Sequence, residues 1–110
     1  MNIFDLYLDR IITIIKKAKS DGFLLLPENL NAINVDIPPH QFDCDISTNV
    51  AMVLSKLNNK TPVVLAEQLI KLINKDNEIE ELSIAKPGFI NIKFKSSFWN
   101  KFLKEIILNN

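Results

Sequence analysis

The sequence predicts a two-layer α+β domain in which a small, largely antiparallel sheet carries helices on one face. Four segments repeat apolar residues every three to four positions, which is the spacing of an amphipathic helix. Two adjacent segments alternate apolar and polar residues and are joined by Pro-Gly, which is typical of an antiparallel hairpin. The expected order is helix, strand, helix, helix, strand, strand, helix, with the second face of the sheet open to solvent or a partner.

The first predicted helix covers about residues 3–19. Lysines occupy its last turn, where they suit the helix dipole, and Gly22 is the expected stop. Ile3, Tyr7 and Ile14 widen its apolar surface beyond a single stripe. A broad face packed in the core is the favoured explanation, with contact to another partner as the alternative.

The other helices are indicated by capping residues. A helix from about Thr48 to Leu57 could be capped by Asp45 or Ser47. Thr61 followed by a proline is a strong start for the next helix, because a hydroxyl cap then precedes proline at the first helical position. A serine at position 96 or 97 can cap the last helix.

Three strands are expected. The stretch Ala32–Ile37 puts its β-branched residues, Ile37 among them, on one face and must end at the two prolines that follow. Glu78–Ala85 is the expected antiparallel partner of the strand that begins at Phe89. The apolar run Phe23–Leu26 leaves the choice between strand and packed loop open.

The stretch from Lys86 to Lys95 has two contrasting faces. Its first four residues match a type II turn, in which glycine takes the positive φ at the third position. As a strand, it points Ile90, Ile92 and Phe94 to the core and Phe89, Asn91, Lys93 and Lys95 to the other, wet side. An aromatic ring, an amide and ammonium groups in one row suit a single-stranded nucleic acid.

Composition narrows the class of protein. The length of 110 residues predicts one domain, residues 1–110, and a hydrophobic fraction of 47% is typical of an ordinary globular chain. The formal net charge is zero, so any contact with nucleic acid must be local or part of a larger binder. No apolar run is long enough to cross a membrane, and Cys44 is the sole cysteine, which together predict a cytoplasmic protein.

The sequence shows no catalytic set. Its two glycines, Gly22 and Gly88, exclude a phosphate-binding loop and a dinucleotide fingerprint. His40 and Cys44 lie four residues apart but lack an orienting group, and no second Cys or His exists to complete a zinc site. We therefore expect no metal and no cofactor in this domain.

Two segments together carry a resemblance to a known family. The first is Pro39-His40-Gln41-Phe42-Asp43-Cys44-Asp45-Ile46-Ser47-Thr48-Asn49-Val50-Ala51, and the second is Pro87-Gly88-Phe89-Ile90-Asn91-Ile92. They resemble a Gly-Asp-aromatic-small-Thr-Asn-x-Ala helix start and a Pro-Gly-Phe-Ile-Asn segment in the N-terminal domain of arginyl-tRNA synthetase. Cys44 stands where that family usually has glycine, and Ile46 where it usually has an aromatic residue.

The resemblance implies a non-catalytic accessory domain of a class I synthetase, which recognises the D-loop of tRNA(Arg). It implies that Phe89 stacks on a base, that Asn91 contacts the edge of that base, and that Lys86 contributes. We also expect Lys93 and Lys95 to contact phosphates, because they are positively charged and lie on the same strand face as Phe89 and Asn91.

The resemblance also implies partners outside this domain: tRNA(Arg) and the catalytic domain of the same synthetase, with no role for DNA or a membrane. Neither ATP signature of class I synthetases, the His-x-Gly-His type or the Lys-Met-Ser-Lys type, occurs in the chain, so ATP belongs to the parent enzyme. An excised synthetase fragment is the first hypothesis. A free-standing tRNA-binding relative and a protein-interaction module remain as alternatives.

Overall fold

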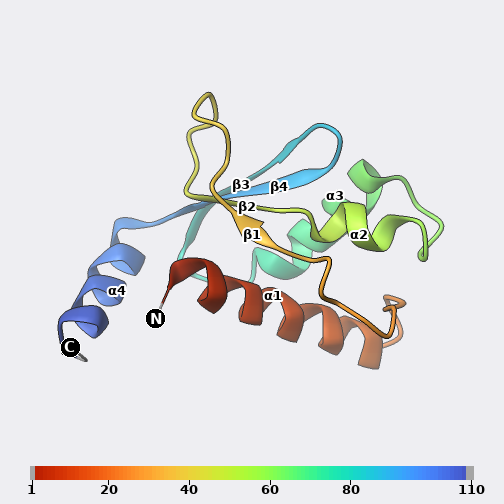
Figure 1. Cartoon of the computed structure of the whole chain (residues 1–110), viewed down its shortest axis with the longest axis horizontal. Coiled ribbons are helices and arrows are strands. Elements are labelled where there is room, and N and C mark those ends of the chain that lie inside the picture. Colours follow the sequence, from red (N-terminus) through yellow and green to blue (C-terminus); the bar gives the residue numbers. More distant parts are fainter. Residues whose placement is uncertain (1, 109–110) are drawn as a thin grey trace.

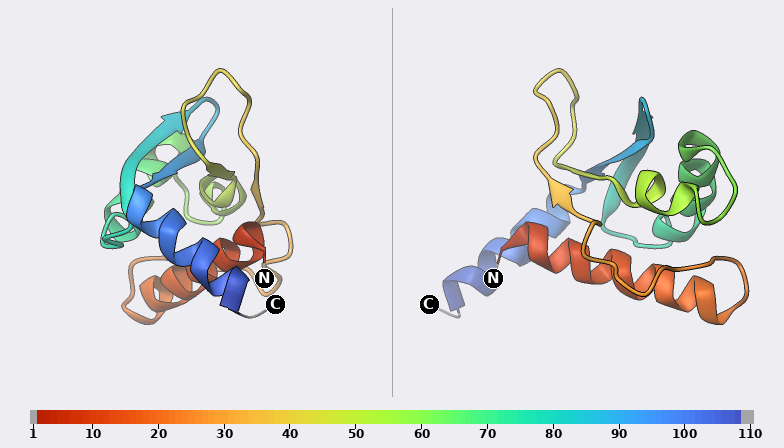
Figure 2. Two further views of the ribbon diagram at one scale, coloured as in Figure 1. Left: turned by 90° about the vertical axis from the view of Figure 1, so that its left-hand side faces the viewer. Right: turned by 45° about the vertical axis from the view of Figure 1, so that its right-hand side comes forward.

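Within residues 2–108, which the computed structural model describes, four antiparallel strands form a sheet in the order β1-β2-β4-β3 (Figure 1). Helices α1, α2 and α3 pack on one face of it, and α4 leaves the end of β4 and points away from the sheet (Figures 1 and 2). The α+β class is confirmed. The elements are α1 (Ile3–Ser20), β1 (Val35–Asp36), β2 (Ile46–Thr48), α2 (Val50–Ser55), α3 (Pro62–Ile73), β3 (Ile79–Ala85), β4 (Phe89–Phe94) and α4 (Ser96–Leu108). None of the helices within residues 2–108 combines the length and apolarity that crossing a membrane requires.

The apolar side of α1 packs against the core along its length. Tyr7 is fully buried, and its hydroxyl donates a hydrogen bond to Asp76 Oδ2 at 3.2 Å. Burial raises the pKa of this phenol well above its ordinary value, so it stays a donor. Ile3 and Ile14 also pack against the core, which confirms the interpretation of the wide apolar surface as a core face.

The ends of α1 follow local chemistry. The Oδ1 atom of Asn2 accepts hydrogen bonds from the backbone N–H groups of Phe4 (2.7 Å) and Asp5 (3.4 Å), an N-cap that the sequence analysis missed. At the other end Gly22 has φ +84°, so the predicted glycine stop is confirmed.

The segment before α2 differs from the prediction. Ile46–Thr48 pairs with β4 as strand β2, and neither Asp45 nor Ser47 caps a helix. Instead, Asp45 Oδ2 accepts from the backbone N–H of Phe94 at 2.8 Å, and the N–H of Val50 donates to Thr48 Oγ1 at 3.2 Å. A three-residue strand is too short to show an alternating pattern. Its pairing partner also lies more than forty residues away in sequence, so no local pattern reveals the pairing.

The expected first strand is shorter than predicted. Only Val35 and Asp36 pair with β2, although Ile33 is buried as expected. Ile37, expected on the core side, is 77% exposed, because the chain leaves the sheet before the two prolines. The run Phe23–Leu26 is a loop.

The turn between β3 and β4 is not of type II. The peptide bond before Pro87 is cis, Gly88 does not have a positive φ, and the turn hydrogen bond runs from Gly88 N–H to Ala85 O at 3.0 Å. Gly88 is needed for space instead. A Cβ atom there would lie 2.5 Å from Pro62 Cβ and 3.2 Å from Met52 Cγ, so the hairpin packs closely on α3 and α2.

Replacing Thr61 with alanine should lower the free energy of unfolding by about 0.5–2 kcal/mol. Thr61 is the N-cap of α3, as predicted, and its Oγ1 accepts from Val64 N–H at 3.3 Å. Urea denaturation measures the change. Thr13→Ala is the matched control, because the Thr13 hydroxyl bonds only to Asp9 O on the exposed side of α1. Equal losses in both variants would contradict the capping role.

Helix α4 is anchored by aromatic packing at its first half only. Phe98 stacks on Phe94 with ring centroids 4.2 Å apart, and Trp99 meets the same ring edge-on at 5.9 Å. Further along, Leu103 is 53% exposed and Ile107 is 71% exposed. These two residues lie one turn apart, so the second half of α4 carries an uncovered apolar stripe.

Candidate nucleic-acid interface

A row of polar side chains crosses the sheet face that α1, α2 and α3 leave uncovered. The strand register pairs Asp36 of β1 with Ser47 of β2, Ser47 with Asn91 of β4, and Asn91 with Ser83 of β3. Directly opposite residues on neighbouring strands point to the same side of a sheet. These four side chains, here called the polar row, therefore share the outer face.

A pocket of about 420 Å³ lies over this row. Asp36, Ser47 and Asn91 of the polar row line it. The loop between β1 and β2 (residues 37–45, here called the wall loop) contributes Ile37, Pro38, Pro39, Gln41 and Phe42. The remaining lining residues are Asn34, Ala85, Lys86 and Phe89. The wall loop projects from the sheet on the side opposite α1 (yellow in Figure 1), so the pocket is formed between the sheet and this loop.

Aromatic rings reach the pocket from two separate segments. Phe89, at the start of β4, is 37% exposed and is paired with the small Ala85, and Phe42 comes from the wall loop. Lys86 lies at the hairpin end of the same pocket and is exposed, with no ion pair found for it among residues 2–108. One end of the pocket thus combines a partly exposed ring with an unpaired cation.

Asn91 lies on the predicted face but is not wet. It is only 2% exposed, and its Nδ2 atom has no hydrogen-bond partner, the one such buried side-chain atom found within residues 2–108. A buried amide nitrogen without an acceptor destabilises a fold and is rare in proteins. Asn91 is also one of the residues that line the pocket, so the unpartnered donor lies next to the space that a bound molecule could fill.

The two remaining lysines of the predicted row are not alike. Lys93 Nζ lies 2.9 Å from Asp43 Oδ2 in the wall loop and 3.7 Å from Glu80 Oε2 in β3. The hydrogen bond and charge of Asp43 raise the pKa of Lys93, with smaller contributions from Glu80 and Glu81. Lys95 is exposed and follows the end of β4, outside the set of pocket-lining residues. Lys93 therefore already has anionic partners, and Lys95 lies apart from the pocket.

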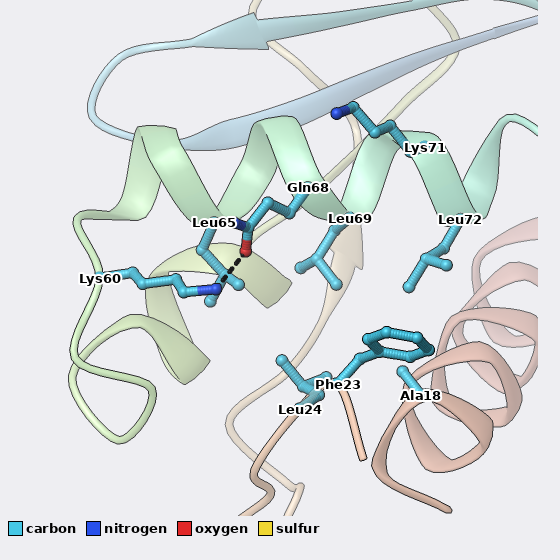
Figure 3. A pocket seen from close by; sticks show the side chains of 9 residues that line it. All are labelled: Ala18, Phe23, Leu24, Lys60, Leu65, Gln68, Leu69, Lys71 and Leu72. Atoms are coloured by element: carbon cyan, nitrogen blue, oxygen red, sulfur yellow. Dashed lines mark hydrogen bonds between the residues drawn. The ribbon is translucent and has the colours of Figure 1, made fainter. Parts of the chain in front are cut away.

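A second pocket, of about 290 Å³, lies between α3 and the segment after α1 (Figure 3). Leu65, Leu69 and Leu72 of α3 face Phe23 and Leu24 across it, as the sticks in Figure 3 show. Its polar rim is partly satisfied, because Lys60 Nζ donates to Gln68 Oε1 at 2.6 Å. Among the described residues, no buried polar atom without a partner lies in this apolar groove, so the pocket over the polar row is the better candidate for a specific ligand.

Comparison with known sequences shows the family of this chain. The family model described as "Arginyl tRNA synthetase N terminal domain" matches residues 8–94. The chain belongs to this family. An arginine–tRNA ligase of Pelagibacter ubique is 66% identical over 111 residues, and one of Chelativorans sp. is 38% identical over 112 residues. A third, from Citrifermentans bemidjiense, is 46% identical over 88 residues and covers 79% of this chain.

The synthetase relatives are much longer than the chain. The alignments cover 100% of this chain but 19% of the Pelagibacter ligase, and 98% of this chain but 18% of the Chelativorans ligase. The 110 residues thus span about a fifth of the relatives that they match. This share fits the N-terminal domain of a synthetase.

The departures from the synthetase pattern are accommodated without strain. Cys44, which replaces a usual glycine, does not have a positive φ. Burial raises the pKa of its thiol, and the carboxylates of Asp45 and Asp43 raise it further, so the thiol form is favoured and nucleophilic chemistry is not. Ile46 replaces a usual aromatic residue and is buried in the core at 1% exposure. Within residues 2–108 no group of three or more potential metal ligands exists around His40 or elsewhere.

Several residues of the pocket were not predicted from the sequence. Asp36 and Ser47 enter it only through the register of β1, β2 and β4, which no local pattern encodes. Gln41 and Phe42 enter it because the projecting wall loop forms one side of the pocket. No local signal marks either residue, because a single aromatic side chain in a loop is ordinary.

Proposed function

We propose that this chain binds tRNA(Arg) and that the pocket over the polar row receives one unpaired nucleotide of the D-loop. The observation that carries the proposal is the buried, unpartnered Nδ2 atom of Asn91 in a pocket that Phe89 also lines. A volume of about 420 Å³ falls within the range of small-ligand pockets. Unstacked bases of RNA loops are typically recognised by stacking on an aromatic ring together with hydrogen bonds to the base edge.

Each predicted residue has a proposed role. The ring of Phe89 stacks on the base, and Asn91 Nδ2 donates to an acceptor on the base edge. Lys86, exposed and unpaired at the hairpin end, contacts a phosphate of the same nucleotide. Lys95 adds a phosphate contact beyond the pocket. Lys93 can contact a phosphate only in competition with Asp43 and Glu80.

The wider activity is assigned to the longer enzyme. In this proposal the domain supports ATP-dependent charging of tRNA(Arg) with arginine, and the reaction takes place in the part of an arginine–tRNA ligase outside these 110 residues. The uncovered stripe on α4, with Leu103 and Ile107, offers an apolar contact for that part. Association through this stripe would bury the two leucine-sized side chains that the isolated fold leaves in solvent.

Charge explains why recognition must be local. The formal net charge is zero, so a general electrostatic field does not hold tRNA on the domain. Binding depends instead on the few contacts at the pocket and on the rest of the enzyme. We expect weak binding by the isolated domain that falls further as salt is raised.

The experiment is an abasic scan of the tRNA. Versions of tRNA(Arg) that lack a single base at successive D-loop positions are titrated against the chain at low salt, with fluorescence anisotropy as the readout. One D-loop position should lose about 10- to 100-fold in affinity, the equivalent of one base–aromatic stack with its hydrogen bonds. Abasic sites in the anticodon loop serve as the control. Equal affinity for every D-loop variant would contradict the proposal.

A further inference from the structure

The wall loop projects from the sheet (Figure 1) and makes few hydrogen bonds to other elements. Between Pro38 and Cys44 the loop bonds to itself, from Phe42 N–H to Pro39 O (3.1 Å) and from Cys44 N–H to Phe42 O (3.0 Å). Within residues 2–108, the hydrogen-bonded ion pair of Asp43 with Lys93 is the only such contact found between this stretch and another element. Among the described residues, the polar contacts of this stretch with the rest of the domain thus come down to the Asp43–Lys93 pair, beside the apolar contact of the buried Pro38.

The backbone on either side of this link is well fixed. Asp45, two residues after Asp43, donates its N–H to Ile92 O at 2.9 Å and accepts at Oδ2 from Phe94 N–H at 2.8 Å. On the other side of the loop, Asp36 pairs with Ser47. The part that lines the pocket, including Gln41 and Phe42, lies between these two fixed ends and has no such bond to the sheet other than through Asp43.

We infer that Lys93 is a positioning residue: through its ion pair with Asp43 it holds the wall loop against β4 and so shapes the pocket that receives the nucleotide. The inference rests on the proposed function for its consequence in tRNA binding. The positioning itself concerns only the fold. The Lys93 side chain is 32% exposed and lies on β4, whereas that of Asp43 is 92% exposed on the loop, so the lysine is the more fixed member of the pair.

This role makes an unusual prediction for Asp43→Asn. Removing a negative charge near a polyanion normally strengthens binding, and it would also free Lys93 to contact a phosphate. If the ion pair positions the loop, the same substitution weakens binding instead. Exposed ion pairs contribute little to stability, which limits the expected loss to about two- to fivefold in tRNA affinity.

The test combines two measurements on the chain. Amide relaxation by NMR, without RNA, reports the order of Gln41 and Phe42, and anisotropy at low salt reports affinity for tRNA(Arg). Asp43→Asn and Lys93→Met should loosen both amides and weaken binding, whereas Lys93→Arg, which keeps the charge, should restore both. Glu80→Gln is the matched control, because it removes the other partner of Lys93, at 3.7 Å, and leaves the link to the loop intact.

The outcomes separate this inference from the proposed function. Unchanged loop order in Asp43→Asn, or an affinity for tRNA that rises, overturns the positioning role. Failure of the proposed function appears elsewhere: Phe89→Ala then leaves affinity for tRNA unchanged, while the loosened loop of Asp43→Asn is still seen in the absence of RNA.

Discussion

Replacing Phe89 with alanine is expected to weaken binding of tRNA(Arg) by about 1–3 kcal/mol, the usual contribution of a base stacked on an aromatic ring. The ring is 37% exposed at the mouth of a pocket and faces no large side chain across the hairpin, since its partner is Ala85. Its removal should therefore change the fold little and the contact with the base strongly. Titration of the variant with tRNA at low salt measures the loss.

Phe23→Ala is the matched control for this substitution. Phe23 is also an exposed phenylalanine, at 76%, but it lines the apolar groove between α1 and α3 (Figure 3). Its loss should leave tRNA affinity unchanged. Similar losses in both variants would mean that exposed rings bind RNA without specificity, and no loss in Phe89→Ala would remove the stacking role.

The second large effect is expected for Asn91→Leu, and it has two opposite parts. Leucine has nearly the shape of asparagine and carries no donor, so it relieves the unpartnered Nδ2 atom in the folded domain. The free energy of unfolding should rise by about 1 kcal/mol, because a buried donor without an acceptor costs roughly that much. Affinity for tRNA should fall by about 10- to 100-fold, since the base edge loses its hydrogen bond and meets an apolar group instead.

Asn58→Leu is the matched control for the stability of Asn91→Leu. The amide of Asn58 is satisfied: it accepts from Leu25 N–H at 2.8 Å and donates to Leu25 O at 3.0 Å and to Leu54 O at 2.8 Å. The same substitution there should lower the free energy of unfolding by about 1–3 kcal/mol. A destabilised Asn91→Leu variant, measured by urea denaturation beside it, would show that Asn91 is a structural amide and not one kept for a ligand.

The parts of the fold that the sequence predicts are those with local causes. The Thr61 cap, the Gly22 stop and the division of β4 side chains between two faces each depend on a few neighbouring residues, and each is found in the structure. Strand β2 was missed because three residues show no period, and its pairing with β4 is a contact of long sequence separation. The turn at Gly88 was assigned the wrong type, and the need for glycine comes from the close approach of Pro62, which residues 86–89 alone do not reveal.

For the candidate site, alternation along β4 correctly gave the face of Phe89 and Asn91 but not their environment. Asn91 is only 2% exposed, although alternation along β4 puts it on the outer face. The partners of Lys93 come from two other segments, at Asp43 and Glu80. The sequence of one strand predicts which side chains share a face. The register of the sheet and the position of the loop decide which of those side chains remain exposed and unpaired.

The side-chain amide signals of Asn91, observed by NMR while tRNA(Arg) is added, test the central claim most directly. If Asn91 reads a base, the Nδ2 protons gain an acceptor, and their resonances shift and exchange more slowly with solvent, while the amide signals of Asn58 stay in place. If tRNA binds and the Asn91 amide signals do not move, the pocket over the polar row is not the site that receives the nucleotide.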